Sequence, residues 1–167
     1  NQDYKIPYID DDLDIICIAM NHSGNSIASV STDNAVKIWA EDLENFGRIV
    51  HKIPITDHDV SSLALDRDSK SIAVGCKDGT IQLWRTADER LLREIKAHSG
   101  NVSCLAFSPD GNLIASYADQ EPIILWFRNT GKRGQSFFST ERITSLAFSP
   151  DGAKLIACSE NGTVATW

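Results

Sequence analysis

Short apolar runs separated by turn residues make up the hydrophobic pattern of the chain. Four of these runs have closely related letters: Cys17–Met20, Ser62–Leu65, Cys104–Phe107 and Ser145–Phe148. Short runs that are rich in β-branched and aromatic residues, and that end near Gly, Pro, Asn or Asp, are typical of β-strands. No long window shows the helical period of about 3.6 residues, so the pattern predicts an all-β fold.

The turn after each of these runs carries a repeated motif. The letters LAFSPDG span Leu105–Gly111 and return unchanged at Leu146–Gly152, 41 residues further on. In Ser-Pro-Asp-Gly the proline presets φ, the aspartate favours the turn through its side chain, and the glycine accepts a positive φ. Asn21–Gly24 fills this place in the first unit, whereas the second unit has Ser69 where the others have glycine. We therefore expect mild backbone strain at Ser69, which a glycine would relieve.

Tryptophan gives the number of units. Trp39, Trp84, Trp126 and Trp167 lie 45, 42 and 41 residues apart, and an apolar alternation precedes each of them. Each unit also contains an Ile-Ala step, at Ile27–Ala28, Ile72–Ala73, Ile114–Ala115 and Ile156–Ala157. A fixed period near 40 residues indicates stacked repeats, and the alignment contains four.

These segments resemble the WD40 repeat over nearly the whole chain. The resemblance rests on the two LAFSPDG stretches, on Asp33–Trp39 and Asp78–Trp84, and on Ala97–Gly100, which replaces the usual Gly-His. As a departure from the pattern, Ala40, Arg85 and Phe127 rather than Asp follow the tryptophans. The resemblance implies a β-propeller with four WD40-type, four-stranded antiparallel blades around a central channel. We expect these blades to belong to a larger ring of seven or eight.

The expected boundaries lie within one domain. Residues 1–12 are expected to hold the outer strand of a preceding or closing blade and the loop after it. Repeats 1 to 4 are then assigned to residues 13–57, 58–97, 98–138 and 139–167, the last without its outer strand. Because the chain begins without Met and stops on a strand tryptophan, we expect a segment of a longer protein. The ring would be closed by missing blades of that protein or by a second copy, as an eight-blade homodimer.

The family resemblance also implies a buried His–Ser/Thr–Asp–Trp network that ties each blade together. The residues that match it are incomplete in every unit. They are Ser29, Asp33 and Trp39 in the first, and His58, Asp78 and Trp84 in the second, where Val74 replaces the hydroxyl. The third has His98, Ser116 and Trp126, with Gln120 at the acid position and Asp119 beside it, and the fourth has Asn161 and Trp167.

Composition excludes few classes of function. The 167 residues are 42% hydrophobic and 23% charged, which is ordinary for a globular domain. A net charge of −7 argues against a nucleic-acid partner. The sequence has no apolar run long enough to span a membrane and no signal peptide. Cys17, Cys76, Cys104 and Cys158 form no C-x-x-C motif and are expected to be buried, reduced thiols, which favours a cytoplasmic location.

Candidate catalytic and metal sites have simpler structural explanations. His98, Ser116 and Asp119 have the residue types of a nucleophilic triad, but the repeat places them inside a blade as part of the tie. Gly131–Gly134 lacks the spacing of a phosphate loop and is expected to be a hairpin turn. His22, His51, His58 and His98 show no metal-ligand spacing. The sequence therefore predicts no enzyme, no cofactor and no metal.

The function predicted instead is a protein-interaction scaffold. Its binding face would be formed by the loops that lead into the first strands and by the turns between second and third strands. The residues assigned to it are Asp14, Ile16, Thr32, Asp59, Ser61, Lys77, Asn101, Ser103, Asp119, Arg142, Thr144 and Glu160. Acidic and small side chains dominate this set, and Asp10, Asp11 and Asp12 precede it, so a peptide or a basic protein surface is the expected partner.

Two other functions stay open from the sequence. One is a nucleic-acid reader, for which Arg128, Lys132, Arg133 and Arg142 supply a local basic excess. The other is a sensory repeat array attached to a signalling ATPase or protease, with which the regular turns are compatible.

Overall fold

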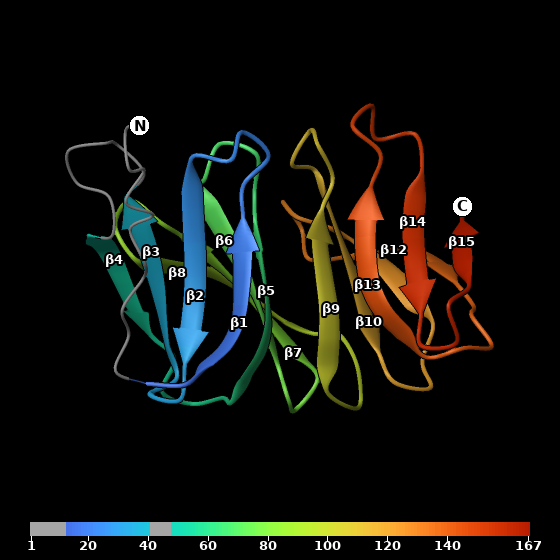
Figure 1. Cartoon of the computed structure of the whole chain (residues 1–167), viewed down its shortest axis with the longest axis horizontal. Helices are drawn as coiled ribbons and strands as arrows, with labels where there is room; N and C mark the ends of the chain where they lie inside the picture. Colours follow the sequence, from blue (N-terminus) through green and yellow to red (C-terminus); the bar gives the residue numbers. More distant parts are fainter. Residues whose placement is uncertain (1–12, 41–47) are drawn as a thin grey trace, which may run out of the picture.

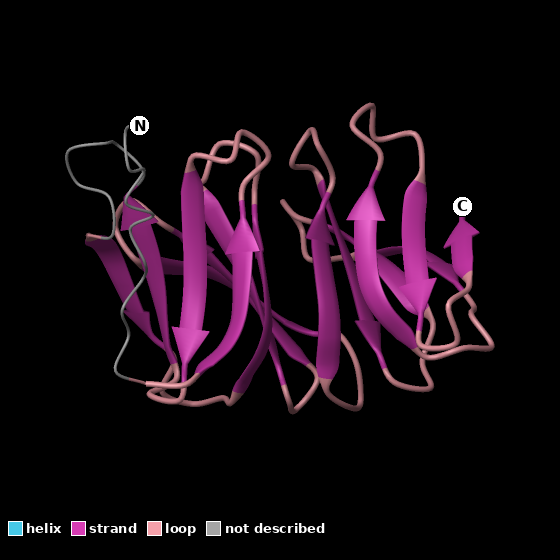
Figure 2. Cartoon of the chain, in the orientation of Figure 1, coloured by secondary structure: helices cyan, strands magenta, loops and turns pink. Residues whose placement is uncertain are grey.

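The computed structural model describes residues 13–40 and 48–167, and within these ranges every regular element is a β-strand (Figure 2). The first sheet contains β1 (Ile15–Met20), β2 (Ser26–Ser31), β3 (Ala35–Ala40) and β4 (Ile49–Pro54). The second contains β5 (Val60–Leu65), β6 (Ser71–Cys76), β7 (Thr80–Arg85) and β8 (Arg90–Lys96). The third contains β9 (Val102–Phe107), β10 (Leu113–Ala118), β11 (Ile123–Phe127) and β12 (Arg133–Phe137). The fourth contains β13 (Ile143–Phe148), β14 (Leu155–Ser159) and β15 (Val164–Thr166).

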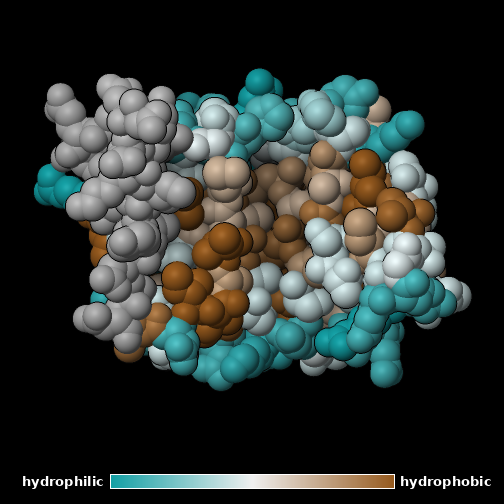
Figure 3. Space-filling model, in the orientation of Figure 1, coloured by the Kyte–Doolittle hydropathy of each residue, from teal (hydrophilic) through white to brown (hydrophobic). Residues whose placement is uncertain are grey.

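The four sheets are successive blades of a β-propeller, as predicted. All strand pairs are antiparallel, and each sheet follows the order of the chain. The first strands β1, β5, β9 and β13 stand next to one another in a row, with the first and fourth sheets at its two ends (Figure 1). They line a hollow of about 330 Å³, which opens toward the viewer in Figure 3. The predicted strand within residues 1–12 lies outside the described residues.

The hairpin turns between first and second strands confirm the prediction made from the Ser-Pro-Asp-Gly motif. Gly24, Gly111 and Gly152 have φ values of 74°, 70° and 72°. Ser69 has φ 56° at the equivalent place, so a residue with a Cβ is held in the left-handed region there. The backbone strain expected at Ser69 is therefore present.

The register of the fourth sheet corrects one part of the repeat alignment. Leu146 pairs with Ala157, as Leu105 pairs with Ser116 and Leu63 pairs with Val74. Leu155 rather than Ile156 is thus the equivalent of Ile114. The Ile-Ala letters at Ile156–Ala157 are therefore one residue out of register with Ile114–Ala115, and the spacing of 41 residues holds between the third and fourth units.

Apolar side chains between neighbouring blades form the core. Leu63, Ile72 and Val74 of the second blade share one cluster with Val30 and Val36 of the first. Two further clusters join the second blade to the third and the third to the fourth. Each fully buried Val, Leu or Ile contributes about 1.5–3 kcal/mol, so these interfaces supply most of the stabilisation.

The four cysteines differ in how far they are buried. All four are free thiols; Cys76 and Cys104 are buried and Cys17 is half-buried. Cys158 is exposed, so the prediction of a buried thiol is wrong there. It lies on β14, on the face opposite to that of Ala157, which packs in the cluster shared with the third blade. In residues 13–40 and 48–167 we also find no helix that is long and apolar enough to cross a membrane.

Candidate interaction face and its polar ties

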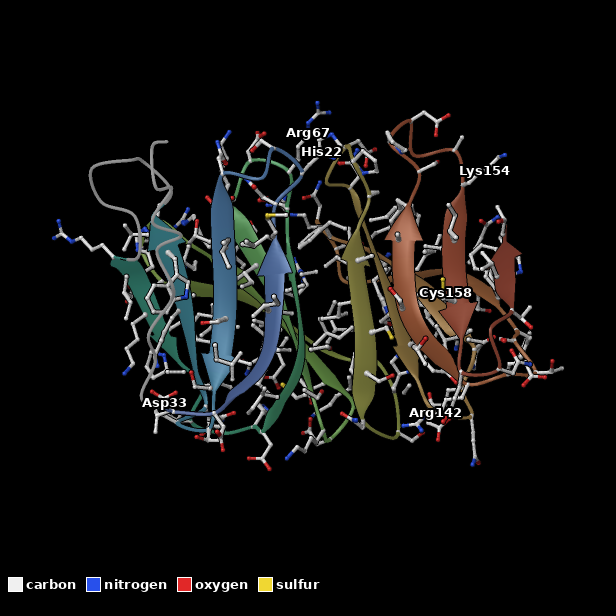
Figure 4. All side chains as sticks on the ribbon, in the orientation of Figure 1. His22, Asp33, Arg67, Arg142, Lys154 and Cys158 are labelled. Atoms are coloured by element: carbon white, nitrogen blue, oxygen red, sulfur yellow. The ribbon has the colours of Figure 1, made fainter. Side chains whose placement is uncertain are left out.

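The loops of the propeller gather at two opposite ends. Asp33 and Arg142 mark the lower end in Figure 4, where the turns between second and third strands meet the loops that lead into the first strands. His22, Arg67 and Lys154 mark the upper end, where the first two strands of each blade are joined. We call the lower end, with the twelve residues predicted from the sequence to bind a partner, the lower face.

Backbone hydrogen bonds join predicted residues in pairs in the first, second and fourth blades. The amide of Thr32 donates to the carbonyl of Asp14 at 3.0 Å, and the amide of Lys77 donates to Asp59 at 2.9 Å. The amide of Glu160 donates to the carbonyl of Arg142, also at 2.9 Å. Each hydrogen bond joins the residue before or at the start of a first strand to the residue after the second strand of the same blade. The same arrangement is therefore present in the first, second and fourth blades.

A β-bulge places one further predicted residue in every blade. The pairing register skips Ile16, Ser61, Ser103 and Thr144, which lie near the start of the four first strands. Bulges re-aim side chains and are common near functional surfaces. The Ser61 hydroxyl donates to the carbonyl of Val102 at 2.8 Å, and that of Thr144 to Cys158 at 3.2 Å. These hydroxyls are therefore engaged with backbone, whereas the Ile16 side chain is 45% exposed.

The charges of the lower face leave an acidic excess. Lys77 forms an ion pair with Asp59 at 3.5 Å, and Arg142 forms one with Glu160 at 3.6 Å. Exposed pairs of this kind contribute little to stability, but each one offsets a predicted cation with an acid of the same blade. Asp14 and Asp119 are exposed and add negative charge to the face.

The third blade contains the most complete polar tie. The indole Nε1 of Trp126 donates to Ser116 Oγ at 2.8 Å, and Ser116 Oγ lies 2.7 Å from His98 Nε2. His98 Nδ1 lies 2.8 Å from Glu121 Oε2. With a proton on His98 Nδ1, every group has a partner: tryptophan donates to serine, serine to histidine, and histidine to the carboxylate.

Glu121 supplies the acid of this tie, which corrects the assignment of Gln120. In the other blades the side chain six residues before the tryptophan accepts from the amide two residues later, as Asp78 does from Thr80 at 3.0 Å. The third blade has Pro122 at that later place, and proline has no amide N–H. Gln120 adopts φ 61° instead, and the longer side chain of Glu121 reaches the histidine.

The pKa values agree with a neutral histidine beside an ionised acid. Burial lowers the pKa of the His98 imidazole and outweighs Glu121, which acts in the opposite direction. Desolvation raises the pKa of the Glu121 carboxyl, but hydrogen bonds from His98 and Ser99 outweigh it and lower that pKa. The tie is thus held by hydrogen bonds to a carboxylate, with the imidazole uncharged.

In the second blade the predicted His58–Asp78 pair forms, but the tryptophan stands apart from it. His58 Nδ1 lies 3.0 Å from Asp78 Oδ2, while Trp84 Nε1 donates to Gln82 at 3.1 Å because Val74 has no hydroxyl. Desolvation raises the pKa of the Asp78 carboxyl, but hydrogen bonds from Thr80, His58 and Lys96 outweigh it. They hold that pKa well below its ordinary value.

The first blade uses an asparagine that sequence reasoning missed. Trp39 Nε1 donates to Ser29 Oγ at 2.9 Å as predicted, and Asp33 forms ion pairs with Lys37 and Lys52. Asn34 accepts from the amide of Val60 at 2.9 Å and donates to the carbonyls of two residues in the loop that leads into the second blade. The available sequence signal was its place, which glycine fills in the second and fourth blades, and Asn34 adopts φ 56° there.

In the fourth blade the two matched residues do not meet through a tie. Asn161 accepts from the Ser159 hydroxyl at 2.6 Å and from the Thr163 amide at 3.0 Å. Trp167 packs against Phe137, with the ring centroids 5.6 Å apart. Ala157 has the place that Ser29 and Ser116 fill elsewhere, so this blade lacks the hydroxyl.

Comparison with known proteins identifies the family. The model of the WD domain, G-beta repeat family matches residues 10–40, 47–85, 89–120 and 131–167. The chain belongs to the WD40-repeat family.

Individual WD40 relatives are more distant and much longer. The protein groucho of Drosophila melanogaster is 31% identical over 103 residues, which cover 62% of this chain and 14% of groucho. Periodic tryptophan protein 2 of Arabidopsis thaliana is 27% identical over 120 residues, 71% of this chain and 13% of the relative. Protein HIR1 of Cryptococcus neoformans is 26% identical over 171 residues, 90% of this chain and 19% of the relative. The chain thus spans less than a fifth of these relatives.

The groups that could carry chemistry in these WD40 blades are engaged with one another. Ser116 is fully buried, and both its hydrogen-bonding directions are taken by Trp126 and His98. It therefore cannot reach a substrate as a nucleophile. In the described part of the chain, His58, Cys76 and Asp78 lie close enough to approach one metal ion. Burial raises the pKa of the Cys76 thiol to about 12, and a protonated thiol is a poor ligand.

The cations proposed for nucleic-acid binding are divided between the two ends of the WD40 propeller. Arg128 contacts the upper hairpins: its guanidinium lies 3.3 Å from the buried carboxylate of Asp66 and 5.8 Å from the ring of Phe107. Arg142 lies on the lower face beside Glu160. Arg128 and Arg142 thus lie at opposite ends and do not share one basic stripe of the kind that binds a phosphate backbone.

Proposed function

We propose that this WD40 propeller is an interaction scaffold that binds a basic peptide or protein surface on the lower face. One observation carries the proposal: the pairs Asp14–Thr32, Asp59–Lys77 and Arg142–Glu160 recur at the same end of the first, second and fourth blades, with their side chains exposed. Rigid scaffolds that present loops in this manner commonly bind through those loops. Propellers of the WD40 family generally bind protein partners, and this supports the choice of ligand class.

The charge of the face supports a cationic partner. Two of its cations are already offset by neighbouring acids, whereas Asp14 and Asp119 add unbalanced negative charge. Complementary charge mainly sets specificity and the rate of association. We therefore expect a lysine- and arginine-rich peptide to bind, with an affinity that falls as salt is added.

Fluorescence anisotropy with a labelled lysine- and arginine-rich peptide tests this proposal. Asp119→Arg should weaken binding by about three-fold to ten-fold, as expected when a favourable surface charge is reversed. Asp68→Arg is the matched control because Asp68 is exposed on an upper hairpin. Equal binding of an acidic peptide of the same length, or equal effects of the two variants, would show that the lower face is not the site.

Two further assignments concern the cellular compartment and the attachment of the repeats. The free thiols of Cys76 and Cys104 favour a reducing, intracellular compartment. Attachment of the repeats to a signalling ATPase or protease stays a prediction from the sequence.

A further inference from the structure

Three arginines without an acidic partner lie on the outer strands of the second and third blades. Arg90 and Arg93 belong to β8, and Arg133 begins β12. Arg90 and Arg133 are exposed, and Arg93 is half-buried. Within the residues that the structure describes, none of the three forms an ion pair, although the chain has 23 acidic residues against 16 lysines and arginines. We call these three side chains the arginine surface.

The strand registers show that two of these side chains project toward the same interface. Arg93 pairs with Leu83 across the second sheet. Arg133 pairs with Trp126 across the third. Leu83 and Trp126 lie in the apolar cluster that the second and third blades share. Residues directly opposite each other in neighbouring strands project from the same face of a sheet, so Arg93 and Arg133 belong to the two faces that meet there.

Arg90 projects from the same face of the second blade as Arg93. Ser71 pairs with Arg85, and Arg85 pairs with Arg90, so the three form one row across the sheet. The hydroxyl of Ser71 accepts a hydrogen bond from the guanidinium of Arg128, which belongs to the third blade. The whole row therefore faces the third blade.

The acids of this region are engaged with other groups. Arg85 forms an ion pair with Asp88, and Arg128 forms one with Asp66 at 3.3 Å. Glu94 projects from the other face of β8, where it forms an ion pair with the histidine of the second-blade tie. Three guanidinium charges therefore remain unbalanced on the arginine surface.

Contacts with the third blade hold Arg93 in place. Its Nη2 donates to the carbonyl of Asn129 at 2.8 Å. Gly131 lies against the side chain, and a Cβ at Gly131 would stand 2.7 Å from Arg93 Cδ. Because this side chain is held before a ligand arrives, less conformational entropy is lost on binding.

We propose that the arginine surface binds an acidic peptide segment along the outer edges of the second and third blades. Like charges on facing surfaces make the local potential positive. Guanidinium groups bind carboxylates through paired, charge-assisted hydrogen bonds, and clusters of arginine recognise acidic motifs in many complexes. The arginine surface is separate from the lower face and prefers the opposite charge, so the propeller would hold two unlike partners.

A nucleic acid fits the arginine surface less well. Trp126, which pairs with Arg133 across the sheet, is 6% exposed and offers no ring on which a base could stack. Three cations are also few for a phosphate backbone, and a chain with a net charge of −7 repels a long polyanion.

Fluorescence anisotropy with a labelled glutamate- and aspartate-rich peptide tests the proposal. The net charge of −7 repels such a peptide, so binding reports a local site. Arg133→Glu and Arg90→Glu should each weaken binding by about ten-fold, and Arg133→Gln by less. Lys154→Glu is the matched control, because Lys154 is exposed on an upper hairpin of the fourth blade and the change of charge is the same (Figure 4). It should change the affinity by less than about two-fold.

The variants at Arg90 and Arg133 should fold, because neither side chain forms a hydrogen bond or an ion pair within residues 13–40 and 48–167. Circular dichroism and an unchanged midpoint in urea verify this. The acidic peptide is titrated alone, so the result does not depend on what the lower face binds. Absence of binding to the unmodified chain, equal effects of Lys154→Glu and Arg133→Glu, or tighter binding of a single-stranded oligonucleotide of the same charge would each overturn the proposal.

Discussion

Replacing Ser116 by alanine should lower the free energy of unfolding more than the equivalent replacement of Ser29 in the first blade. Ser116 and Ser29 have equivalent positions in their blades, and both are 0% exposed. Ser29 Oγ accepts a hydrogen bond from the indole of Trp39. Ser116 Oγ accepts one from the indole of Trp126 and also forms a hydrogen bond with the imidazole of His98. The two substitutions remove the same atoms from equally buried places, so they differ chiefly in the partners that they leave behind.

The expected losses of stability follow from the number of buried polar groups that each substitution leaves without a hydrogen-bond partner. Each buried polar group that loses its partner costs about 1–3 kcal/mol. Ser29→Ala leaves one such group, the Trp39 N–H, and should cost about 1–3 kcal/mol. Ser116→Ala leaves the Trp126 N–H and His98 Nε2, so it should cost about 2–6 kcal/mol.

Urea denaturation measures both losses. If the slope m is the same for both variants, the difference between their midpoints gives the additional free energy lost when His98 Nε2 has no hydrogen-bond partner. We expect Ser116→Ala to be the more damaging by at least about 1 kcal/mol. Equal losses would refute the reasoning, because they would mean that the His98–Ser116 hydrogen bond contributes nothing to stability.

Three further predictions concern the turn, the titration and the upper hairpins. Ser69→Gly should raise the free energy of unfolding by up to about 1 kcal/mol, since glycine accepts φ 56° without strain; a loss in thermal denaturation would contradict this. The pKa of His98 is lowered by folding from its ordinary 6.5, so the unfolded chain binds the proton first. Stability should therefore decrease as pH falls below about 6.5, and His98→Gln should flatten that part of a stability–pH curve; an unchanged slope would show that His98 does not cause it. Arg128→Met should cost about 3 kcal/mol by stranding the buried Asp66 carboxylate, and adding Asp66→Ser, the residue of the third and fourth hairpins, should recover most of it in urea denaturation.

The sequence was sufficient for features that depend on local chemistry or on the repeat period. The motif placed Ser69 where glycine belongs, and its φ of 56° agrees. The resemblance to the WD40 repeat implied a contact between His58 and Asp78, which lie 3.0 Å apart. Both inferences assume that equivalent positions in repeats have equivalent surroundings, and the second also needs the family pattern.

Features that break the repeat could not be predicted in this way. Counting back from Trp126 assumes a turn of constant geometry, and Pro122 changes that geometry, so the acid moves from Gln120 to Glu121. The contact between Arg128 and Asp66 depends on how the second and third blades pack. Such contacts are tertiary, and no pattern within one unit specifies them.

Amide chemical-shift mapping tests the central claim most directly, because it reports where a ligand binds. The isotope-labelled chain would be titrated with the lysine- and arginine-rich peptide. We expect the largest shifts on the lower face, at Asp14, Asp59, Asp119 and their neighbours. Shifts concentrated on the upper hairpins around His22, Arg67 and Lys154, or no shifts on saturation with peptide, would contradict it.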